Sequence, residues 1–170
     1  MKIAAVDAEC YRRALAKTLS DSTRGQMTHF QLVSVRSKTD NGAEGVGYTY
    51  TVDVGGRAIK SLIEDDIKSI LLGADPRNIE RLWKQMWWAL HYIARGGLVA
   101  FAMSAVDIAL WDLGAKISDM PLWQYLGGAD NKAAAYGGGV DLWFSIDELK
   151  EQASGYLKRG IKALKMKVGR

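Results

Sequence analysis

Two lysines stand one residue apart near the end of the sequence, in the run Ala-Leu-Lys-Met-Lys-Val at 163–168. The apolar residues around them predict a β-strand over 161–168, and alternate residues of a strand lie on the same face. Lys165 and Lys167 therefore share a face, about 7 Å apart. At that separation each ammonium disfavours protonation of the other, and partial burial adds to this, so the pKa of a lysine falls toward neutrality. One lysine can then act as a general base at pH 7, while the other holds a carboxylate.

The same two lysines also fit an ordinary amphipathic strand with a solvated face, and the three-residue pattern alone does not separate these interpretations. The preceding elements favour catalysis. The segment 133–139, inside a Gly-rich stretch at 131–143, predicts a strand, Ser145 and Glu148 have the spacing of a capping box, and the helix behind them ends at Gly160. This order predicts a parallel, right-handed β–α–β unit. The lysines stand at the carboxyl end of its second strand, where (β/α)8 barrels carry catalytic residues.

The first third of the sequence predicts a different arrangement of strands. Segments 2–16, 28–39 and 46–52 have the composition or the alternation of strands. An Asn-Gly turn signal separates the last two, and the polar segment 18–27 predicts a loop between the first two. These segments predict a three-stranded antiparallel meander.

Helical patterns follow the meander. Apolar residues recur at helical spacing from Ile59 to Leu71. Asp75 and Pro76 predict the start of a second helix, because aspartate caps helices and proline suits the first turn. A third helix, predicted over 98–116, is apolar on most sides, which is typical of a central core helix.

Composition narrows the class of protein. The formal charge of +4 comes from scattered residues without a basic block, which suits an anionic small substrate or a solvated surface and does not indicate nucleic acid. Cys10 is the only cysteine, which favours a reducing compartment. The N-terminus lacks the pattern of a signal peptide, and no stretch reaches about 18 uninterrupted apolar residues. We therefore expect a cytoplasmic protein with no membrane partner.

The third predicted helix begins a longer and more specific pattern. The run AMSAVDIALWDLGAKISDMPLWQYLGG at 102–128 resembles the signature region of the mandelate racemase and muconate lactonizing enzyme branch of the enolase superfamily. The match comprises the A-x-S-A-V-D-x-A-L-W-D-L core, Lys116, Pro121-Leu122 and the final Leu-Gly-Gly. Tyr125 departs from the aliphatic residue expected there, which is a packing variation. The meander, the helices and the L-K-M-K-V-G run also follow the family's order, so the resemblance covers essentially the whole sequence.

The resemblance implies a fold and a reaction. Residues 1–128 would form an α+β capping domain, a three-stranded antiparallel meander plus helices, and 129–170 the first β–α–β unit of an incomplete (β/α)8 TIM-like barrel. Such enzymes abstract the proton α to a carboxylate and stabilise the enolate on Mg²⁺. Lys167 matches the family's general base. Lys165 matches the lysine that lowers the pKa of the base and lies near the substrate carboxylate.

The same resemblance places the magnesium ligands on later barrel strands, beyond residue 170. We therefore expect no metal ligand in this segment, and no activity from the segment alone. Asp107 and Asp112 lie in the signature helix, and we expect them to be structural hydrogen-bond or ion-pair partners, since buried charges need pairing. Asp141 and Asp147 are likewise not assigned to a metal.

Loops of the capping domain close over the barrel mouth in this family and set its specificity. They correspond here to 18–28, with Arg24, and to 47–57, with Tyr48 and Tyr50. Arg24 would hold an acid or hydroxyl group and the tyrosines would line the pocket; solvated loop residues are the alternative. The polar residues of both loops suit a polyhydroxylated carboxylate better than an aryl one.

These observations lead to a Mg²⁺-dependent acid-sugar dehydratase, a hydro-lyase. The alternative within the superfamily is a racemase, epimerase or cycloisomerase, because the two lysines serve all of them. A non-catalytic binding module is the alternative of a different class. We expect a small carboxylate substrate and a homo-oligomer.

Overall fold

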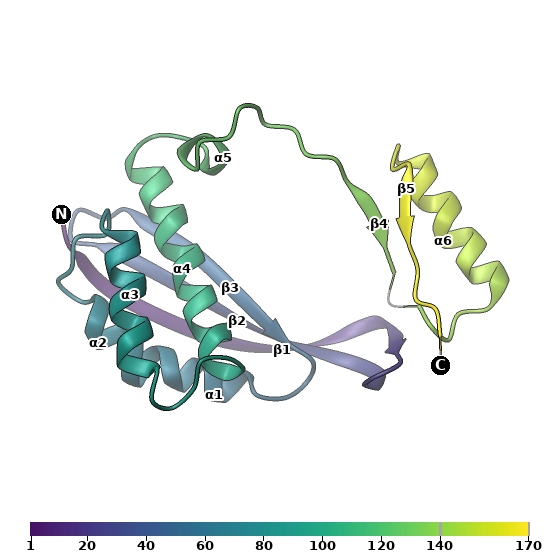
Figure 1. The fold of residues 1–170 in the computed structure, drawn as a ribbon, viewed down its shortest axis with the longest axis horizontal. Helices are drawn as coiled ribbons and strands as arrows, with labels where there is room; N and C mark the ends of the chain where they lie inside the picture. Colours follow the sequence, from purple (N-terminus) through teal and green to yellow (C-terminus); the bar gives the residue numbers. More distant parts are fainter. Residues whose placement is uncertain (140, 170) are drawn as a thin grey trace. The chain divides into compact units, whose positions relative to one another are not determined.

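The computed structural model describes residues 1–139 and 141–169 (Figure 1). By its internal contacts the chain divides into two compact units. One unit consists of Met1–Arg13 and Phe30–Asn131, and the other of Ala14–His29 and Lys132–Arg170. Residues 14–29 thus group with the C-terminal part of the chain, although they continue the strands of the first unit. The division into domains at residue 128 stays a prediction.

The predicted meander is confirmed. Its strands are β1 (Ile3–Asp21), β2 (Gly25–Thr39) and β3 (Glu44–Thr51), and they lie in the order β1-β2-β3. β2 and β3 pair antiparallel, from Lys38 opposite Glu44 to Gln31 opposite Thr51. The Asn-Gly turn joins them: Gly42 has a φ of 89°, which glycine adopts without strain.

The loop predicted over 18–27 is wrong, because β1 continues to Asp21 and β2 begins at Gly25. One side chain makes the tight turn. Oδ1 of Asp21 accepts hydrogen bonds from the backbone N–H groups of Thr23, at 3.0 Å, and Arg24, at 2.7 Å. Aspartate favours such turns because its carboxylate bonds the backbone two and three residues on. The polar segment 18–27, whose composition predicts a loop, therefore forms the tip of a long hairpin.

The helix predicted from residue 59 to 71 forms as one continuous helical stretch. Its segments are α1 (Gly56–Ser61), the π-helical η1 (Leu62–Ile67) and α2 (Lys68–Leu71). A stripe at every fourth residue is fully buried in the core: Ile59, Ile63, Ile67 and Leu71.

The second helix, α3 (Ile79–Leu90), begins later than Asp75 and Pro76 predicted. Asp75 does not cap it, because its carboxylate instead accepts hydrogen bonds from the backbone N–H of Arg77, at 3.0 Å, and from the Arg77 guanidinium, at 2.6 Å. The N–H of Asn78 donates to the Asp75 carbonyl at 3.2 Å, which closes a separate turn. The helix then starts from Asn78, whose carbonyl accepts from the N–H of Leu82 at 3.0 Å.

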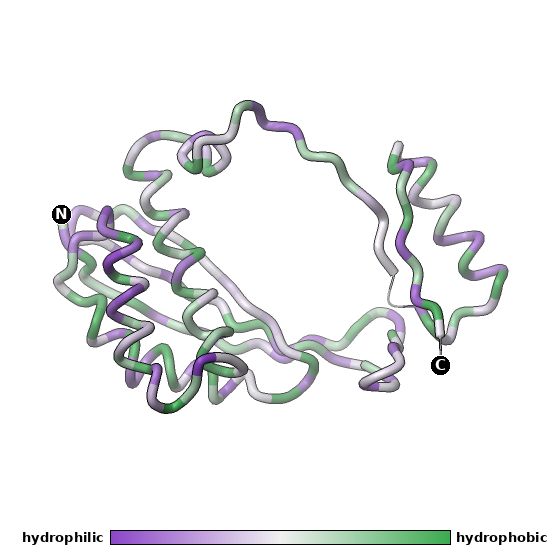
Figure 2. Tube along the Cα trace, in the orientation of Figure 1, coloured by the Kyte–Doolittle hydropathy of each residue, from purple (hydrophilic) through white to green (hydrophobic). Residues whose placement is uncertain are grey.

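The central helix α4 (Leu98–Ile117) is confirmed as the predicted core helix. It packs so closely on β3 that a Cβ built on Gly47 would lie 2.0 Å from the Ala105 carbonyl oxygen. Figure 2 shows α4 as hydrophobic over most of its length. Among the described residues, α4 is the one helix long and apolar enough by composition to cross a membrane, a property that buried core helices share. The short α5 (Leu122–Tyr125) follows it.

The second unit contains the predicted β–α–β arrangement. β4 (Tyr136–Gly138) and β5 (Ala163–Lys165) pair in parallel, and α6 (Ile146–Lys158) connects them. The capping box is confirmed: Ser145 Oγ accepts from the Glu148 N–H at 3.3 Å, and the Ser145 N–H donates to Glu148 Oε2 at 2.8 Å. The α+β capping fold followed by the start of a barrel is therefore the fold class of this chain.

Both strands of this unit are shorter than the predicted strands 133–139 and 161–168. The apolar face of the second strand is also uncovered, because one helix cannot cover every face of two strands. Its side chains are exposed in the described chain: Leu164, Met166 and Val168.

Candidate active site

The two predicted catalytic lysines stand at the carboxyl end of β5. Lys165 is the last residue of the strand and pairs with Gly138 of β4. Its carbonyl accepts a hydrogen bond from the N–H of Gly139 at 3.1 Å, which carries the pairing one residue further. Lys167 follows two residues later and is half-buried, whereas Lys165 is exposed. The two lysines therefore lie two residues apart where the strand ends.

Asp141 holds the backbone of Lys167. Its Oδ1 accepts a hydrogen bond from the Lys167 N–H at 3.0 Å. The residue is only 1% exposed, and its second oxygen, Oδ2, has no hydrogen-bond partner among the described residues. Gly139 leaves room for this carboxylate, because a Cβ at that position would lie 2.1 Å from Oδ2.

The hairpin tip contacts the same strand ends. Ser20, at the end of β1, forms a parallel bridge with Asp141, and the N–H of Leu142 meets the Ser20 carbonyl at 3.5 Å. Backbone hydrogen bonds from Arg24 and Thr23 lower the pKa of Asp21, and the positive charge of Lys167 lowers it further. Residues of the tip therefore lie within electrostatic range of the second lysine.

A second contact attaches the tip to the start of α6. Lys17 Nζ donates to Glu148 Oε1 at 2.7 Å and lies 3.8 Å from the centre of the Phe144 ring. The hydrogen bond from Lys17, followed by those from Ser145, lowers the pKa of Glu148 to about 2. The acid that completes the capping box of α6 thus also anchors the hairpin.

The three predicted substrate-binding residues are distributed over both units. Arg24 is exposed at the turn of the hairpin tip, in the unit that holds the lysines. Tyr48 and Tyr50 lie on β3 of the other unit, 57% and 55% exposed, and the Tyr50 ring lies 5.5 Å from that of Phe30. The structure therefore brings Arg24 into the unit of Lys167, while binding roles for all three residues stay predictions.

The acidic residues of the signature helix make hydrogen bonds, which is consistent with the structural role expected of them. Asp112 accepts hydrogen bonds from Val46 and Lys116. Burial raises the pKa of Asp107, and a hydrogen bond from the Trp111 side chain opposes this effect. Within 1–139 and 141–169, no group of three or more His, Cys, Asp or Glu side chains has a geometry that could hold a metal ion.

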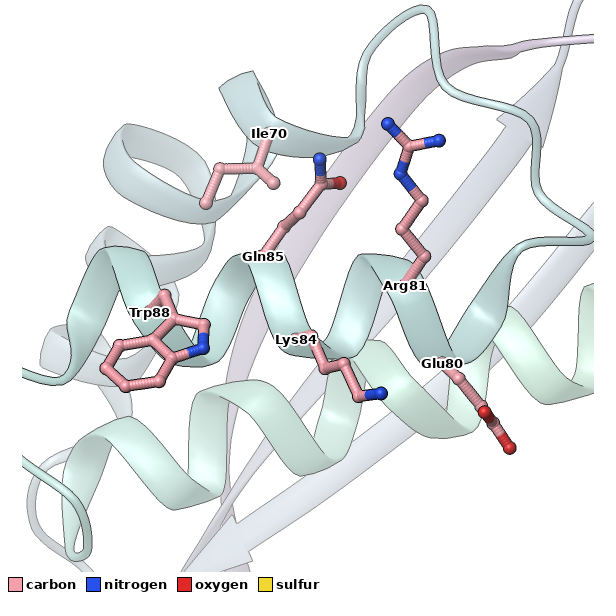
Figure 3. A pocket seen from close by; sticks show the side chains of 6 residues that line it. All are labelled: Ile70, Glu80, Arg81, Lys84, Gln85 and Trp88. Carbon is pink, nitrogen blue, oxygen red and sulfur yellow. The ribbon is translucent and has the colours of Figure 1, made fainter.

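An open groove occurs elsewhere, on the outer side of α3 (Figure 3). None of the predicted site residues lines it. Its walls come from α2 and α3 and consist of Ile70, Glu80, Arg81, Lys84, Gln85 and Trp88.

Sequence reasoning missed the role of Asp141. The resemblance assigns this residue no metal role. One signal could have found it: a single acid follows the run of three glycines that ends the first strand of the β–α–β unit. An acid at such a strand end lies beside the next parallel strand, which here carries the lysines.

Comparison with known proteins agrees with these features. Residues 8–127 match the model of the mandelate racemase/muconate lactonizing enzyme N-terminal domain. The chain is 48% identical over 165 residues to the 3,6-anhydro-alpha-L-galactonate cycloisomerase of Streptomyces coelicolor, covering 97% of this chain and 46% of that enzyme. It is 31% identical over 144 residues to the L-talarate/galactarate dehydratase of Salmonella typhimurium, covering 84% and 36%.

Solved structures give the same result. A racemase from Streptomyces coelicolor with bound magnesium superimposes with a TM-score of 0.96 at 48% identity, over 99% of this chain and 47% of that one. The chain thus spans about half the length of the relatives it matches, or less. With a family model that covers most of its residues, this chain belongs to the mandelate racemase/muconate lactonizing enzyme family of the enolase superfamily.

Proposed function

We propose that this chain is part of an enzyme that removes the proton α to a substrate carboxylate, with Lys167 as the general base. The observation that carries the proposal is the placement of Lys167 at the carboxyl end of β5, where a buried carboxylate holds its backbone. Lys165 precedes it on the same face and supplies a positive charge to the substrate carboxylate. Arg24 and the β3 tyrosines, Tyr48 and Tyr50, complete the proposal as contacts for substrate hydroxyl groups.

The reaction we favour is dehydration of an acid sugar. Lys167 takes the α-proton, the electron pair of that C–H bond forms a C=C bond, and the C–O bond of the β-hydroxyl breaks. The departing hydroxide takes a proton and leaves as water. Support comes from relatives named as dehydratases of galactarate and arabinonate, and from a solved talarate dehydratase with bound magnesium and L-glucarate.

Magnesium enters this proposal through the relatives, where it would stabilise negative charge on the enolate oxygens. The described residues of this chain contain no set of ligands for it. The chain's own contribution is therefore the base, its positioning and the residues that surround the substrate.

A cycloisomerase is the second candidate, because the relative at 48% identity over 97% of this chain carries that name. A racemase or epimerase shares the same first step. These reactions differ in what happens after proton abstraction. We further propose a cytoplasmic homo-oligomer, consistent with the single cysteine and with the small-molecule metabolism of the relatives.

The test uses a protein of the relatives' full length that contains this chain. We expect it to exchange the α-proton of at least one acid sugar with deuterium from the solvent, and expect Lys167→Ala to abolish this exchange. Lys162→Ala is the matched control, because Lys162 is an exposed lysine just before β5. Retained exchange in Lys167→Ala would contradict the role of the base. Product analysis then distinguishes dehydration from cycloisomerisation and racemisation. No exchange with any acid sugar would favour a binding module.

A further inference from the structure

We infer that Asp141 is a positioning residue for the base, which holds Lys167 in place by continuing the pairing of β4 with β5 after β4 has ended. This inference rests on the proposed function of Lys167. It assigns a role to the buried Asp141 carboxylate, which the proposal does not use as a metal ligand and which forms none of the ion pairs described above.

The hydrogen-bond pattern shows that the Asp141 side chain replaces a backbone acceptor of β4. In a parallel ladder the bonding groups of a strand recur every second residue. The Lys165 carbonyl accepts from Gly139, and the next group of that strand to face β4 is the N–H of Lys167. By then β4 has ended at Gly138, and the Lys167 N–H donates at 3.0 Å to the side chain of Asp141. A carboxylate thus occupies the place of a strand.

The hydrogen bond from the Lys167 N–H to Asp141 is well suited to hold the backbone. A hydrogen bond to an ionised carboxylate is about twice as strong as one between neutral groups. Asp141 is only 1% exposed, so water does not compete for it. Fixing the backbone of Lys167 fixes the direction of its Cα–Cβ bond, and thereby the origin of the side chain that must reach the α-proton.

Stability alone does not explain this carboxylate. Its Oδ2 is buried without a partner among the described residues, and an unpaired buried polar atom costs about 1–3 kcal/mol. The carboxylate also restricts position 139 to glycine, because a Cβ at that position would lie 2.1 Å from Oδ2. This restriction is a further cost of keeping the carboxylate there. Both residues are explained if the carboxylate is needed where it is.

Three variants of the full-length protein test the inference. Asp141→Ala removes the acceptor, and Asp141→Asn keeps an oxygen that can accept the same bond. Gly139→Ala displaces the carboxylate without removing it, and also displaces Gln152 Oε1, which would lie 2.7 Å from the new Cβ. Asp147→Asn is the control, because the Asp147 side chain is 93% exposed. Gly139 has no positive φ, so its backbone accommodates alanine.

The first measurement does not depend on activity. Hydrogen exchange of the Lys167 amide should be at least about tenfold faster in Asp141→Ala and in Gly139→Ala than in the wild type, and close to wild type in Asp141→Asn. An unchanged exchange rate in Asp141→Ala would overturn the inference. This measurement tests the hold of Asp141 on the Lys167 backbone separately from the proposed function, which inactivity of the wild type on every acid sugar would overturn.

The second measurement is kinetic. A base displaced by about 1 Å loses roughly 100-fold in rate. We expect kcat to fall by about that factor in Asp141→Ala and Gly139→Ala with KM changed less than about threefold, and Asp141→Asn to recover activity to within about tenfold of wild type. Asp147→Asn should be unaffected. A kcat within twofold of wild type in Asp141→Ala, or equal losses in Asp141→Asn and Asp141→Ala, would contradict a positioning role.

Discussion

Asp112 in α4 accepts a hydrogen bond from the backbone N–H of Val46 in β3, at 2.8 Å. The same oxygen, Oδ2, accepts from Lys116 Nζ at 2.6 Å. Because β3 is an edge strand, its outward N–H groups have no neighbouring strand to pair with. An acid of the family's signature helix therefore closes part of a sheet edge.

Removal of this carboxylate should lower stability modestly. We expect Asp112→Ala to lower the free energy of unfolding by about 1 kcal/mol, because the Val46 N–H loses its partner near the surface. Lys116→Met should cost less than about 0.5 kcal/mol, since the Lys116 side chain in this ion pair is 53% exposed. Denaturant unfolding of both variants measures the difference, and an equal loss in the two would show that the ion pair is the main contribution.

The close approach of α4 to β3 predicts a larger effect. Gly47→Ala places a Cβ 2.0 Å from the Ala105 carbonyl oxygen, and the helix backbone cannot move away without disturbing the core. We expect a loss of about 3 kcal/mol in the free energy of unfolding. Gly96→Ala is the control, because nothing lies within 4 Å of a Cβ there. A stable Gly47→Ala protein would mean that α4 is not held as tightly as these distances indicate.

Attachment of the hairpin tip to α6 should weaken at acid pH. The pKa of Glu148 is lowered from 4.5 to about 2 by Lys17 and Ser145, so the charged form stabilises the folded state. That contribution is complete above about pH 4.5 and is lost as the pH falls through about 2. We expect hydrogen exchange of residues 14–29 to be faster in Glu148→Gln than in wild type at pH 6.

The same comparison at lower pH provides the check. The two proteins should converge as the pH approaches 2, because Glu148 is then protonated in the wild type as well. Glu151→Gln, a change at an exposed acid of the same helix, should match wild type at every pH. High salt should reduce the difference, since the Lys17–Glu148 pair is about half exposed.

The 170-residue chain by itself should not respond to magnesium. No set of acidic or histidine ligands is assembled in its described parts, so millimolar MgCl2 should shift its Tm by less than about 1 °C. A protein of the relatives' full length should be stabilised by the same addition. A clear Tm increase of the short chain that EDTA reverses would reveal a metal site within it.

Much of the fold was predictable because local patterns and tertiary packing agree. The Asn-Gly turn, the apolar α4 and the Ser145–Glu148 capping box each have a local cause that the structure retains. Two predictions failed where a side chain redirected the backbone. Asp75 bonds Arg77 and forms a turn ahead of α3, and Asp21 closes a hairpin where composition predicted a loop.

The candidate site was predictable only in part. The spacing of Lys165 and Lys167 predicts a shared face, and the resemblance supplies the roles proposed for them. Asp141 could not be identified in the same way, because its importance depends on a contact between residues 26 positions apart in the sequence. The glycine run before Asp141 marks the end of the first strand, but the contact itself follows from how that strand ends beside the second.

The grouping of residues 14–29 with 132–170 has a consequence for building chimaeric enzymes from relatives. Lys17 contacts Glu148, and Ser20 bridges to Asp141, so each side of this contact depends on residues of the other. A transplanted loop alone would meet foreign partners. The smallest piece that can be exchanged with its contacts intact is therefore discontinuous in sequence, a hairpin tip together with a β–α–β unit more than a hundred residues away.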